Sequence, residues 1–476
     1  MTKTIAVLFA AIVTISAPLA ASAEEWNTMG PRAMGMGGAG VALSQGPLAS
    51  YWNPAALGRA TENSYGVSIP VSVHAALTGS AIAGAKDLKD AKTNCASLGA
   101  AACNSQIANA LGELSNPTNG LRVDGSAGGD FKVGKVAVFV NGFLDAGAVP
   151  RVDTANNSQA NISQNTSALI VKGAQILELG AGYGHELPFA PGVFLGGDLK
   201  LMRAKVGYTN YQIVNNSNNS GNIIDNLKNS ETSSANVGLD AGALWDVDKT
   251  LENAWWSPKV GLTGRNLNNP KFSQPGTAAA DGVGGRYAVN PQVRMGGAIS
   301  PFHWWNLAAD LDLTNNITPV DGVKSRQLGL GSEFNVFNRS WINIPLRFGL
   351  ARNLSAGTNM LTLGTGINLL HFIVDVSGEY SPQKVTIESQ NNGGASKSFP
   401  QEAGASVSIS LLFGGSEDER RLHKMDQQPV PEQKAMEPAK ASNDLPPAQT
   451  EQIKQNADKA QQELNKESAQ PAPTKQ

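Results

Sequence analysis

The sequence is poor in charge and in long apolar runs. Lysine, arginine, aspartate and glutamate make up 16% of its 476 residues, against roughly 25% in an ordinary soluble domain. The formal net charge is only -2, so charge gives no reason to expect a nucleic-acid partner. After the first 23 residues no segment offers about 18 consecutive apolar residues, and we therefore expect no membrane-spanning helix.

Cysteine and histidine are scarce as well. The two cysteines, Cys95 and Cys103, are not spaced as a C-x-x-C pair, which argues against a thioredoxin-like redox site. The five histidines are scattered and share no ligand spacing, so the sequence predicts no metal site. No catalytic motif is present either, and we predict neither catalytic residues nor a cofactor.

The N-terminus has the features of an export signal. Lys3 is followed by an apolar stretch over 5–15 and then by Ala-Ser-Ala at 21–23, the small-residue pattern that precedes signal-peptide cleavage. We therefore expect a signal peptide over 1–23 and a mature chain that starts at Glu24.

The strongest pattern is a two-residue alternation of apolar and polar side chains. Over 235–247, ANVGLDAGALWDV, one face is apolar and the other is mostly small or acidic. The same reasoning predicts strands over 64–74, 135–144, 175–187, 192–206, 235–247, 257–268, 289–300, 304–313, 326–337, 341–352, 359–370, 371–381 and 402–413. Most are longer than the usual five or six residues of a globular strand, and long enough for a tilted strand that crosses a bilayer.

Export, low charge, a high glycine content and long strands together predict an all-β fold. We expect an antiparallel transmembrane β-barrel over 64–413, in the outer membrane of a Gram-negative cell. The apolar face of such a barrel contacts lipid and the polar face lines its interior. Outer-membrane lipid and the barrel assembly machinery are then expected partners.

Three segments depart from the strand pattern. Residues 82–118 are alanine-rich and are expected to form a helical insertion, in a loop or in a plug. This insertion carries Cys95 and Cys103, for which export to an oxidising compartment makes a disulfide an expectation. Residues 24–63 precede the first strand, and residues 414–476 are expected to form a disordered polar tail.

A glycine-rich stretch lies within the segment 24–63. Gly35, Gly37 and Gly40 match the G-x-G-x-x-G spacing of a dinucleotide-binding loop. However, no apolar strand precedes them, and Pro54 interrupts the helix that such a loop requires. The sequence context therefore argues against a nucleotide-binding role.

The stretch GMGGAGVALSQGPLASYWNPAAL resembles the N-terminal region of the FadL-type outer-membrane barrels, which import hydrophobic compounds. It is most similar to a branch called conjugal transfer protein TraF, which the stretches YAVNPQVRMGGAIS and LAADLDLTNN also resemble. The resemblance covers about residues 30–413. It implies a barrel of about 14 strands, with 12 to 16 also compatible.

The resemblance also implies a role for the N-terminal segment. In FadL-type transporters this segment is a plug inside the barrel, and a kinked strand opens a lateral exit to the membrane. The implied plug or gate motif consists of Gly35, Gly37, Gly38, Gly40, Asn53, Pro54 and Ala55. Glycine permits positive φ and close backbone contact, and Asn-Pro favours a rigid turn. A packed lining that does not move is the alternative.

We therefore expect a passive transporter of small hydrophobic molecules, which works by ligand binding, plug rearrangement and exit through the wall, without a chemical step. The alternative is a TraF-like structural or assembly component of a conjugation or secretion apparatus. Phe413 ends the last strand and resembles the terminal insertion signal of outer-membrane barrels, which implies a periplasmic tail. We expect that tail to be a solvated spacer, and the alternative is that it binds a periplasmic partner or the cell wall.

Overall fold

The computed structural model describes residues 22–59, 65–214, 223–251, 254, 256–339, 341–387 and 397–413, and six residues between 451 and 462. The signal peptide expected over 1–23, apart from its last two residues, and nearly all of the tail expected over 414–476 lie outside the described residues. The chain divides into two compact units, Met1–Glu419 and Arg420–Gln476, and the barrel belongs to the first.

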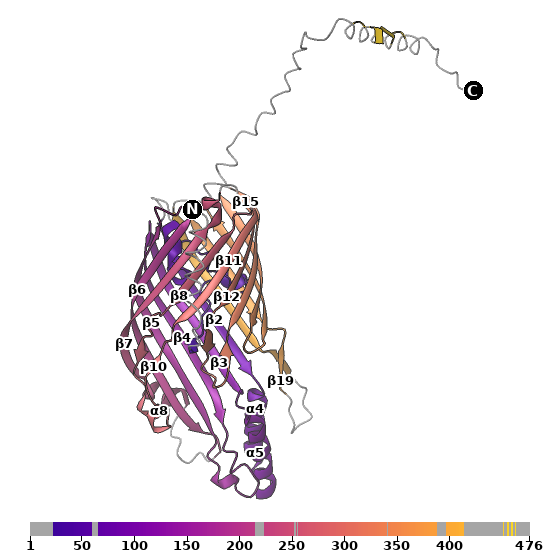
Figure 1. Cartoon of the computed structure of the whole chain (residues 1–476). Coiled ribbons are helices and arrows are strands. Elements are labelled where there is room, and N and C mark those ends of the chain that lie inside the picture. Colours follow the sequence, from indigo (N-terminus) through magenta and orange to yellow (C-terminus); the bar gives the residue numbers. More distant parts are fainter. Residues whose placement is uncertain are drawn as a thin grey trace, which may run out of the picture. The chain divides into compact units, whose positions relative to one another are not determined.

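Fourteen antiparallel strands of the described residues close into one barrel, which confirms the predicted fold class (Figure 1). Closure is made by the first and last strands, which pair from Tyr65↔Phe413 to Ala76↔Glu402. The strands are β2 (Tyr65–Thr78), β3 (Gly120–Val133), β4 (Val136–Arg151), β5 (Ala168–Glu186), β6 (Val193–Gln212), β7 (Thr232–Asp246), β8 (Lys259–Arg265), β11 (Gln292–Phe302), β12 (Trp305–Asp312), β15 (Gln327–Arg339), β16 (Ile342–Asn353), β17 (Asn359–Leu369), β18 (Phe372–Tyr380) and β21 (Glu402–Phe413).

The strand burial is the inverse of that of a soluble protein. On β2 the outward side chains Ile69 and Val71 are 54% and 46% exposed, whereas the inward Ser68, Ser72 and His74 are buried. An exposed apolar outer face around a polar interior is the arrangement that lipid favours, because no backbone edge is left unpaired and the apolar side chains contact hydrocarbon. The barrel therefore has the architecture of an outer-membrane protein.

The two ends of the barrel differ in the length of their connections. At one end the turns are mostly short, such as 134–135, 303–304 and 370–371, and the barrel's first and last residues lie there. At the other end most connections are long, for example 79–119 and 266–291. Outer-membrane barrels have short periplasmic turns and longer extracellular loops, so we call these the periplasmic and the extracellular end.

The extracellular loops contain small elements of their own. The largest is a hairpin of α4 (Ala81–Asn94) and α5 (Ala100–Leu114) between β2 and β3, in which a disulfide joins Cys95 and Cys103 (Figure 1). The other loop elements are η2 (Ile162–Gln164), α6 (Ile223–Ser230), β9 (Lys271–Phe272), α8 (Gly276–Ala280), β10 (Tyr287–Ala288), β13 (Asn315–Ile317), β14 (Lys324–Ser325), β19 (Lys384–Ile387) and β20 (Lys397–Pro400). At the periplasmic end, α7 (Val247–Thr250) follows β7.

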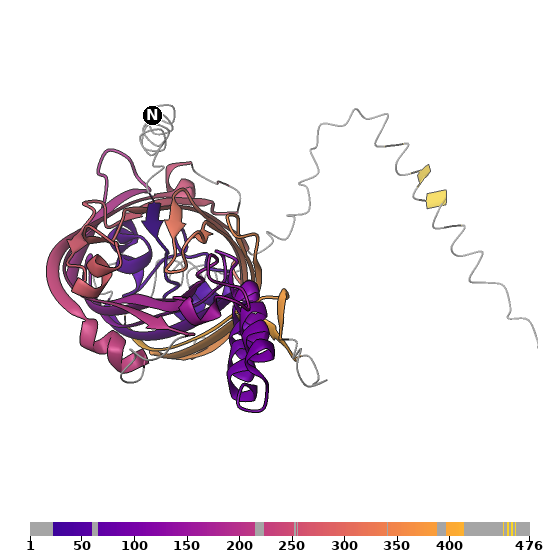
Figure 2. The same ribbon diagram turned by 90° about the horizontal axis from the view of Figure 1, so that it is seen from below.

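Residues 25–59, which we call the plug, lie inside the barrel (Figure 2). Most of the plug residues are buried. β1 (Ser22–Glu24), which pairs with β13, precedes the plug, and the plug contains α2 (Pro31–Gly35), α3 (Ala49–Trp52) and η1 (Pro54–Arg59). None of the helices in the described ranges has the length and apolar character needed to cross a membrane.

Candidate functional site

The glycine stretch of the plug touches the backbone of the barrel wall. Gly37 has a positive φ of 68°, and a Cβ there would lie 2.5 Å from the carbonyl oxygen of Leu350 and 2.7 Å from that of Leu330. Thr362 binds this stretch, because its hydroxyl accepts a hydrogen bond from Gly37 N and donates one to Gly35 O, both at 3.0 Å. Only glycine fits at position 37.

Glycines in the barrel wall leave room for this contact. Where the plug touches β15, β16 and β17, four of the wall residues that face it are glycines, and a Cβ on any of them would approach Met36 or plug backbone atoms within 3.2 Å. These glycines are Gly329, Gly331, Gly349 and Gly364. The plug and wall backbones therefore approach closely here, with Thr362 as the wall side chain that bonds to both plug glycines.

The Asn-Pro-Ala triplet makes a second wall contact. The Asn53 side chain is fully buried, and its Nδ2 donates to the carbonyl oxygen of Ala243 at 3.1 Å. Its Oδ1 accepts a hydrogen bond from the Ala55 amide, which fixes the turn around Pro54. Wall glycines again give the room needed: Gly184, Gly196, Gly242 and Gly261.

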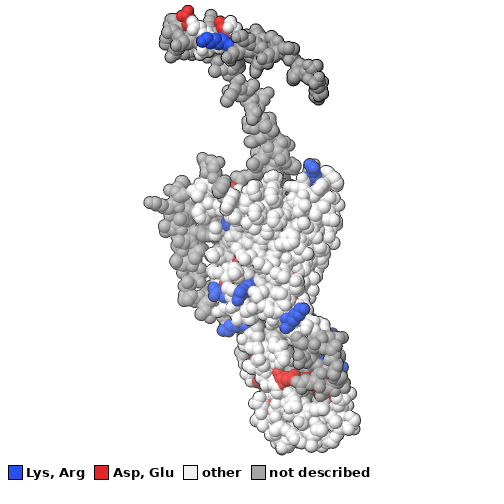
Figure 3. Space-filling model, turned by 90° about the vertical axis from the view of Figure 1, so that its right-hand side faces the viewer, with Lys and Arg blue, Asp and Glu red and all other residues white. Residues whose placement is uncertain are grey.

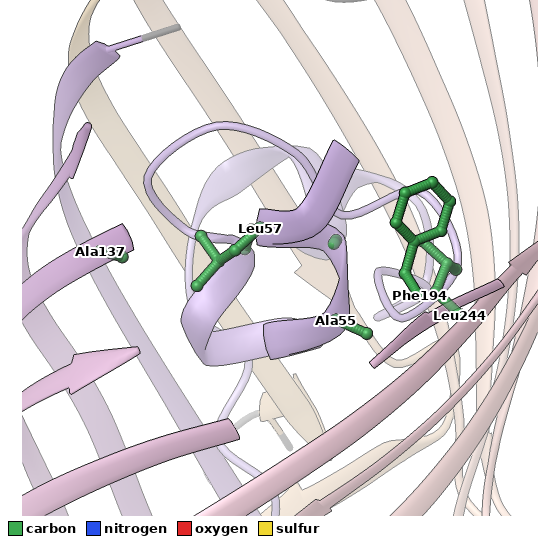
Figure 4. Packing of buried hydrophobic residues seen from close by; sticks show 7 residues of the cluster. Ala55, Leu57, Ala137, Phe194 and Leu244 are labelled. Carbon is green, nitrogen blue, oxygen red and sulfur yellow. The ribbon is translucent and has the colours of Figure 1, made fainter. Parts of the chain in front are cut away.

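Apolar packing continues from this second contact. Ala55 and Leu57 of η1 lie in one buried cluster with Phe194 and Leu244 of the wall (Figure 4). The cluster lies toward the periplasmic end, near the turns that flank β6 and β7. The plug is thereby anchored to the wall just before the chain enters β2.

Gly38 and Gly40 lie between the two contacts. Gly38 also has a positive φ, 82°, but a Cβ there would meet only Thr28 Oγ1, at 3.9 Å. Gly40 has no such space, since its Cβ would lie 2.7 Å from the ring of Trp52. The Gly40 amide donates to Asp310 Oδ2 at 2.8 Å.

The structure thus places all seven residues of the implied motif in the plug, within or between its two wall contacts. It places Cys95 and Cys103 elsewhere, in the extracellular hairpin. Among the described residues no group of three or more His, Cys, Asp or Glu side chains could hold a metal ion.

Two wall arginines lie against the aromatic side chains of the plug. The guanidinium of Arg265 is 4.2 Å from the ring centre of Tyr51, and that of Arg294 is 4.7 Å from the ring centre of Trp26. Cation–π contacts of this kind are worth about 2 kcal/mol or more when desolvated. Burial raises the pKa of the Tyr51 phenol to about 12, so this side chain remains neutral at physiological pH.

Carboxylates on the polar wall bind these arginines and a lysine. Arg265 Nη2 lies 3.3 Å from Glu178 Oε2. The fully buried Lys200 bridges the same carboxylate and a second one, with Nζ 3.0 Å from Glu178 Oε1 and 2.9 Å from Asp240 Oδ2. This cluster forms the polar wall behind the plug aromatic residues.

A second ion-pair cluster holds helix α2. The carboxylate of Glu333 accepts hydrogen bonds from Arg32 of the plug, at 2.7 and 2.9 Å, and from Arg347 of the wall, at 2.7 Å. Arg347 also pairs with Asp375 at 2.7 Å. Arg32 of the plug therefore shares the Glu333 carboxylate with Arg347 of the wall.

A third cluster binds the start of the plug. Glu25 pairs with Arg122, which also contacts Asp124 at 2.9 Å. Asp124 in turn accepts a hydrogen bond from His74 Nδ1 at 2.9 Å. Burial raises the pKa of the Glu25 carboxyl, and the neighbouring Arg122 opposes that rise.

The extracellular half of the lumen has an apolar lining. Inward side chains of β5 and β6 pack with Phe272 and Val289 of the loop 266–291 in a buried cluster that also contains Ala174, Ile176, Met202, Ala204 and Val206. Phe143 of β4 packs against this cluster and stacks on Tyr51 of the plug, with ring centres 5.8 Å apart. Apolar contact is therefore continuous from the loop to the plug.

The wall next to this point is incompletely paired. The β2–β3 ladder runs through Ser68↔Asp130 and resumes at Val71↔Ala127, so it is interrupted at Ile69 and Pro70. Proline has no N–H to donate to the ladder. The opposite residues are glycines, and a Cβ on Gly129 would meet no atom within 4 Å. Ser126 of β3, two residues from Gly128 and on the same inner face, is the cross-strand partner of Phe143 on β4. The interruption therefore lies close to Phe143.

A small cavity lies between the plug and this part of the wall. Its volume is about 40 Å³, and its lining includes Trp26, Met34, Ser72, Arg122 and Ser126. Binding pockets for small molecules are typically about 300 Å³ or larger. This cavity is therefore too small to hold such a molecule, and a ligand could occupy it only if the plug or its side chains moved.

Sequence analysis identified the plug residues but none of their wall partners. Arg265, Arg294 and Glu333 lie on strands whose inward face could not be paired with the plug without the register. The alternation does indicate that charged residues on the polar side of a strand, such as Lys200 and Asp240, face the lumen.

Comparison with known proteins gives a family match and several structural matches. A family model described as F plasmid transfer operon, TraF, protein matches residues 50–312. The Pseudomonas putida toluene transporter TodX is similar over 82% of this chain and 99% of its own, with 10% identity and a TM-score of 0.45. A Pseudomonas aeruginosa FadL homologue is similar over 83% and 99%, with 13% identity and a TM-score of 0.43. No curated protein sequence matches the chain.

Proposed function

The chain belongs to the family described as F plasmid transfer operon, TraF, protein, and from the lumen of the barrel we propose that it is a passive outer-membrane transporter of small hydrophobic molecules. The observation that carries the proposal is the apolar contact from the extracellular cluster through Phe143 to Tyr51, next to an interrupted wall ladder. An aqueous pore would not need an apolar lining.

The proposed path has three steps. A hydrophobic molecule enters the apolar half of the lumen, where loop 266–291 packs over Ile176 and Met202. It then displaces side chains of the plug around Trp26, because the cavity lined by Trp26 and by Ser126, the cross-strand partner of Phe143, is too small to hold it. It leaves sideways into the lipid between β2 and β3, where Pro70 interrupts the ladder. No bond is made or broken.

Uptake by intact cells tests this function. Cells that lack the chain and cells that produce it are exposed to a hydrophobic naphthylamine probe that fluoresces on entering a membrane, and to a polar probe of similar size. We expect the chain to raise the initial uptake rate of the hydrophobic probe at least tenfold and to leave the polar probe unchanged. Equal stimulation of both probes, or of neither, would contradict the proposal.

The family description favours a second function, that of an assembly component of a conjugation or secretion apparatus. On this hypothesis a periplasmic partner binds the polar tail that follows Phe413 in the sequence. Crosslinking in cells followed by purification would then recover a partner with the full chain but not with a chain that ends at residue 416. If transport is the primary role, the chain that ends at residue 416 should take up the probe as fast as the full chain does.

A further inference from the structure

Basic side chains lie at the extracellular edge of the apolar outer surface. On the outward face of β6, Leu199 and Leu201 are 58% and 61% exposed, and the next outward residues toward the extracellular end are Arg203 and Lys205, also exposed. Alternation along a strand puts all four side chains on one face. The change from leucine to a pair of cations marks the level at which hydrocarbon gives way to lipid head groups.

Helix α6 confirms where this edge lies on β6. A Cβ on Gly207, the next outward residue after Lys205, would lie 3.0 Å from Leu227 of α6 and 3.5 Å from Cγ of Glu231, which forms no ion pair with either cation among the described residues. The Tyr208 amide also donates to Ser230 Oγ at 3.2 Å. The helix therefore covers the outer face of β6 immediately beyond the two cations, which leaves Arg203 and Lys205 between the leucines and the helix.

The two cations are available to a ligand. Arg203 Nε donates to the hydroxyl of Ser233, a neutral partner, at 3.1 Å. Within the described residues no carboxylate forms an ion pair with Arg203 or Lys205, and their cross-strand neighbours on β5 are Leu177 and Gln175. The guanidinium fork and the ammonium group therefore keep donors that match phosphate oxygens.

The same transition occurs on another part of the barrel. On β16 the outward Phe348 and Leu350 are exposed, and the next outward residue toward the extracellular end is the exposed Arg352. Figure 3 shows this side of the molecule, where lysine and arginine gather in a band toward the end that bears the long loops, below a nearly uncharged surface.

We propose that the pair Arg203 and Lys205 on β6 binds the phosphorylated head group of the outer-leaflet glycolipid, the lipid A of lipopolysaccharide. Cations beside a lipid-exposed apolar face match a ligand that carries phosphates and acyl chains together. The inference rests on the outer-membrane location and not on transport, so it stands or falls separately from probe uptake.

Titration of the purified full chain tests the proposal. The protein, freed of bound lipid in detergent, is titrated with bisphosphorylated lipid A, and binding is counted by native mass spectrometry. We expect the Arg203→Gln, Lys205→Gln double variant to bind at least tenfold more weakly than the wild type. The matched control is Lys89→Gln, Lys92→Gln on the exposed side of α4, which should bind as the wild type does.

Two further arms identify the source of the affinity. Lipid A without phosphates should bind weakly to the wild type, and inorganic phosphate at millimolar concentration should not displace the intact lipid. Equal binding by both double variants, equal binding of dephosphorylated lipid, or full displacement by inorganic phosphate would each overturn the proposal. Because each variant replaces only exposed side chains, a folded barrel is expected in every case.

Discussion

Replacing Gly37 by alanine is expected to dislodge the plug from the barrel wall. The new methyl group would meet the backbone carbonyl oxygens of Leu350 and Leu330 at 2.5 and 2.7 Å, and backbone in a closed barrel cannot move aside. Alanine at a positive φ destabilises the plugged structure by about 1–2 kcal/mol, and the overpacking destabilises it by about 1–3 kcal/mol more. In planar bilayers the wild type should remain closed to ions, whereas Gly37→Ala should show frequent open-channel events.

Gly38→Ala is the matched control for this experiment. Gly38 has the same left-handed backbone, so its replacement carries the same conformational cost, but the nearest atom to its Cβ is Thr28 Oγ1 at 3.9 Å. We expect it to lower stability slightly and to leave the channel closed. If both variants conduct equally, strain in the plug backbone and not its contact with the wall explains the effect.

Replacing Lys200 by methionine should be strongly destabilising. The Lys200 ammonium is fully buried and lies within 3.0 Å of both Glu178 and Asp240. Methionine keeps the length of the side chain but leaves the two carboxylates with Arg265 alone, at the longer distances of 3.3 and 3.8 Å. Removing one partner of a buried ion pair typically costs about 3–5 kcal/mol. Urea unfolding in detergent, followed by tryptophan fluorescence, measures the loss.

The same strand offers a control for this second prediction. Lys205→Met removes a lysine five residues further along β6, where the side chain points outward and is exposed. We expect its free energy of unfolding to change by no more than about 0.5 kcal/mol. A Lys200→Met protein as stable as Lys205→Met would show that the lumenal carboxylates are hydrated and do not depend on the lysine.

Alternation was sufficient to predict most of the barrel, because outward leucine and valine alternate with inward polar residues on most strands. It did not predict β3 (Gly120–Val133), whose outward positions include Gly125, Ala127 and Gly129. These small residues interrupt the alternation only at the centre of the strand, since its outward ends are apolar and face inward charged residues; the structure shows β3 as the partner of β2 and β4.

The site was predictable on the plug side only. The spacing of Gly35, Gly37 and Gly40 and the Asn-Pro-Ala triplet are local features of the sequence. Their wall partners, such as Thr362 and Ala243, lie between 190 and 327 residues away in the chain. Such contacts depend on strand register, and a shift of one residue would turn the Thr362 side chain to lipid.

The most direct test of transport through the wall is a lock across the interruption between β2 and β3. Ile69 and Gly129 are opposite each other on the outer face, and the space beside Gly129 is open. A cysteine at each position would allow a disulfide to close this point of the ladder. Val73→Cys with Gly125→Cys, where the ladder is already paired, is the matched control, and wild-type cells treated with reductant control for the Cys95–Cys103 bond.

The measurement is the uptake rate of the hydrophobic probe in intact cells before and after reduction. The proposed mechanism predicts that the oxidised Ile69→Cys, Gly129→Cys protein falls to the rate of cells without the chain and recovers on reduction, while the control pair transports throughout. Full uptake with the lock closed would contradict exit between β2 and β3.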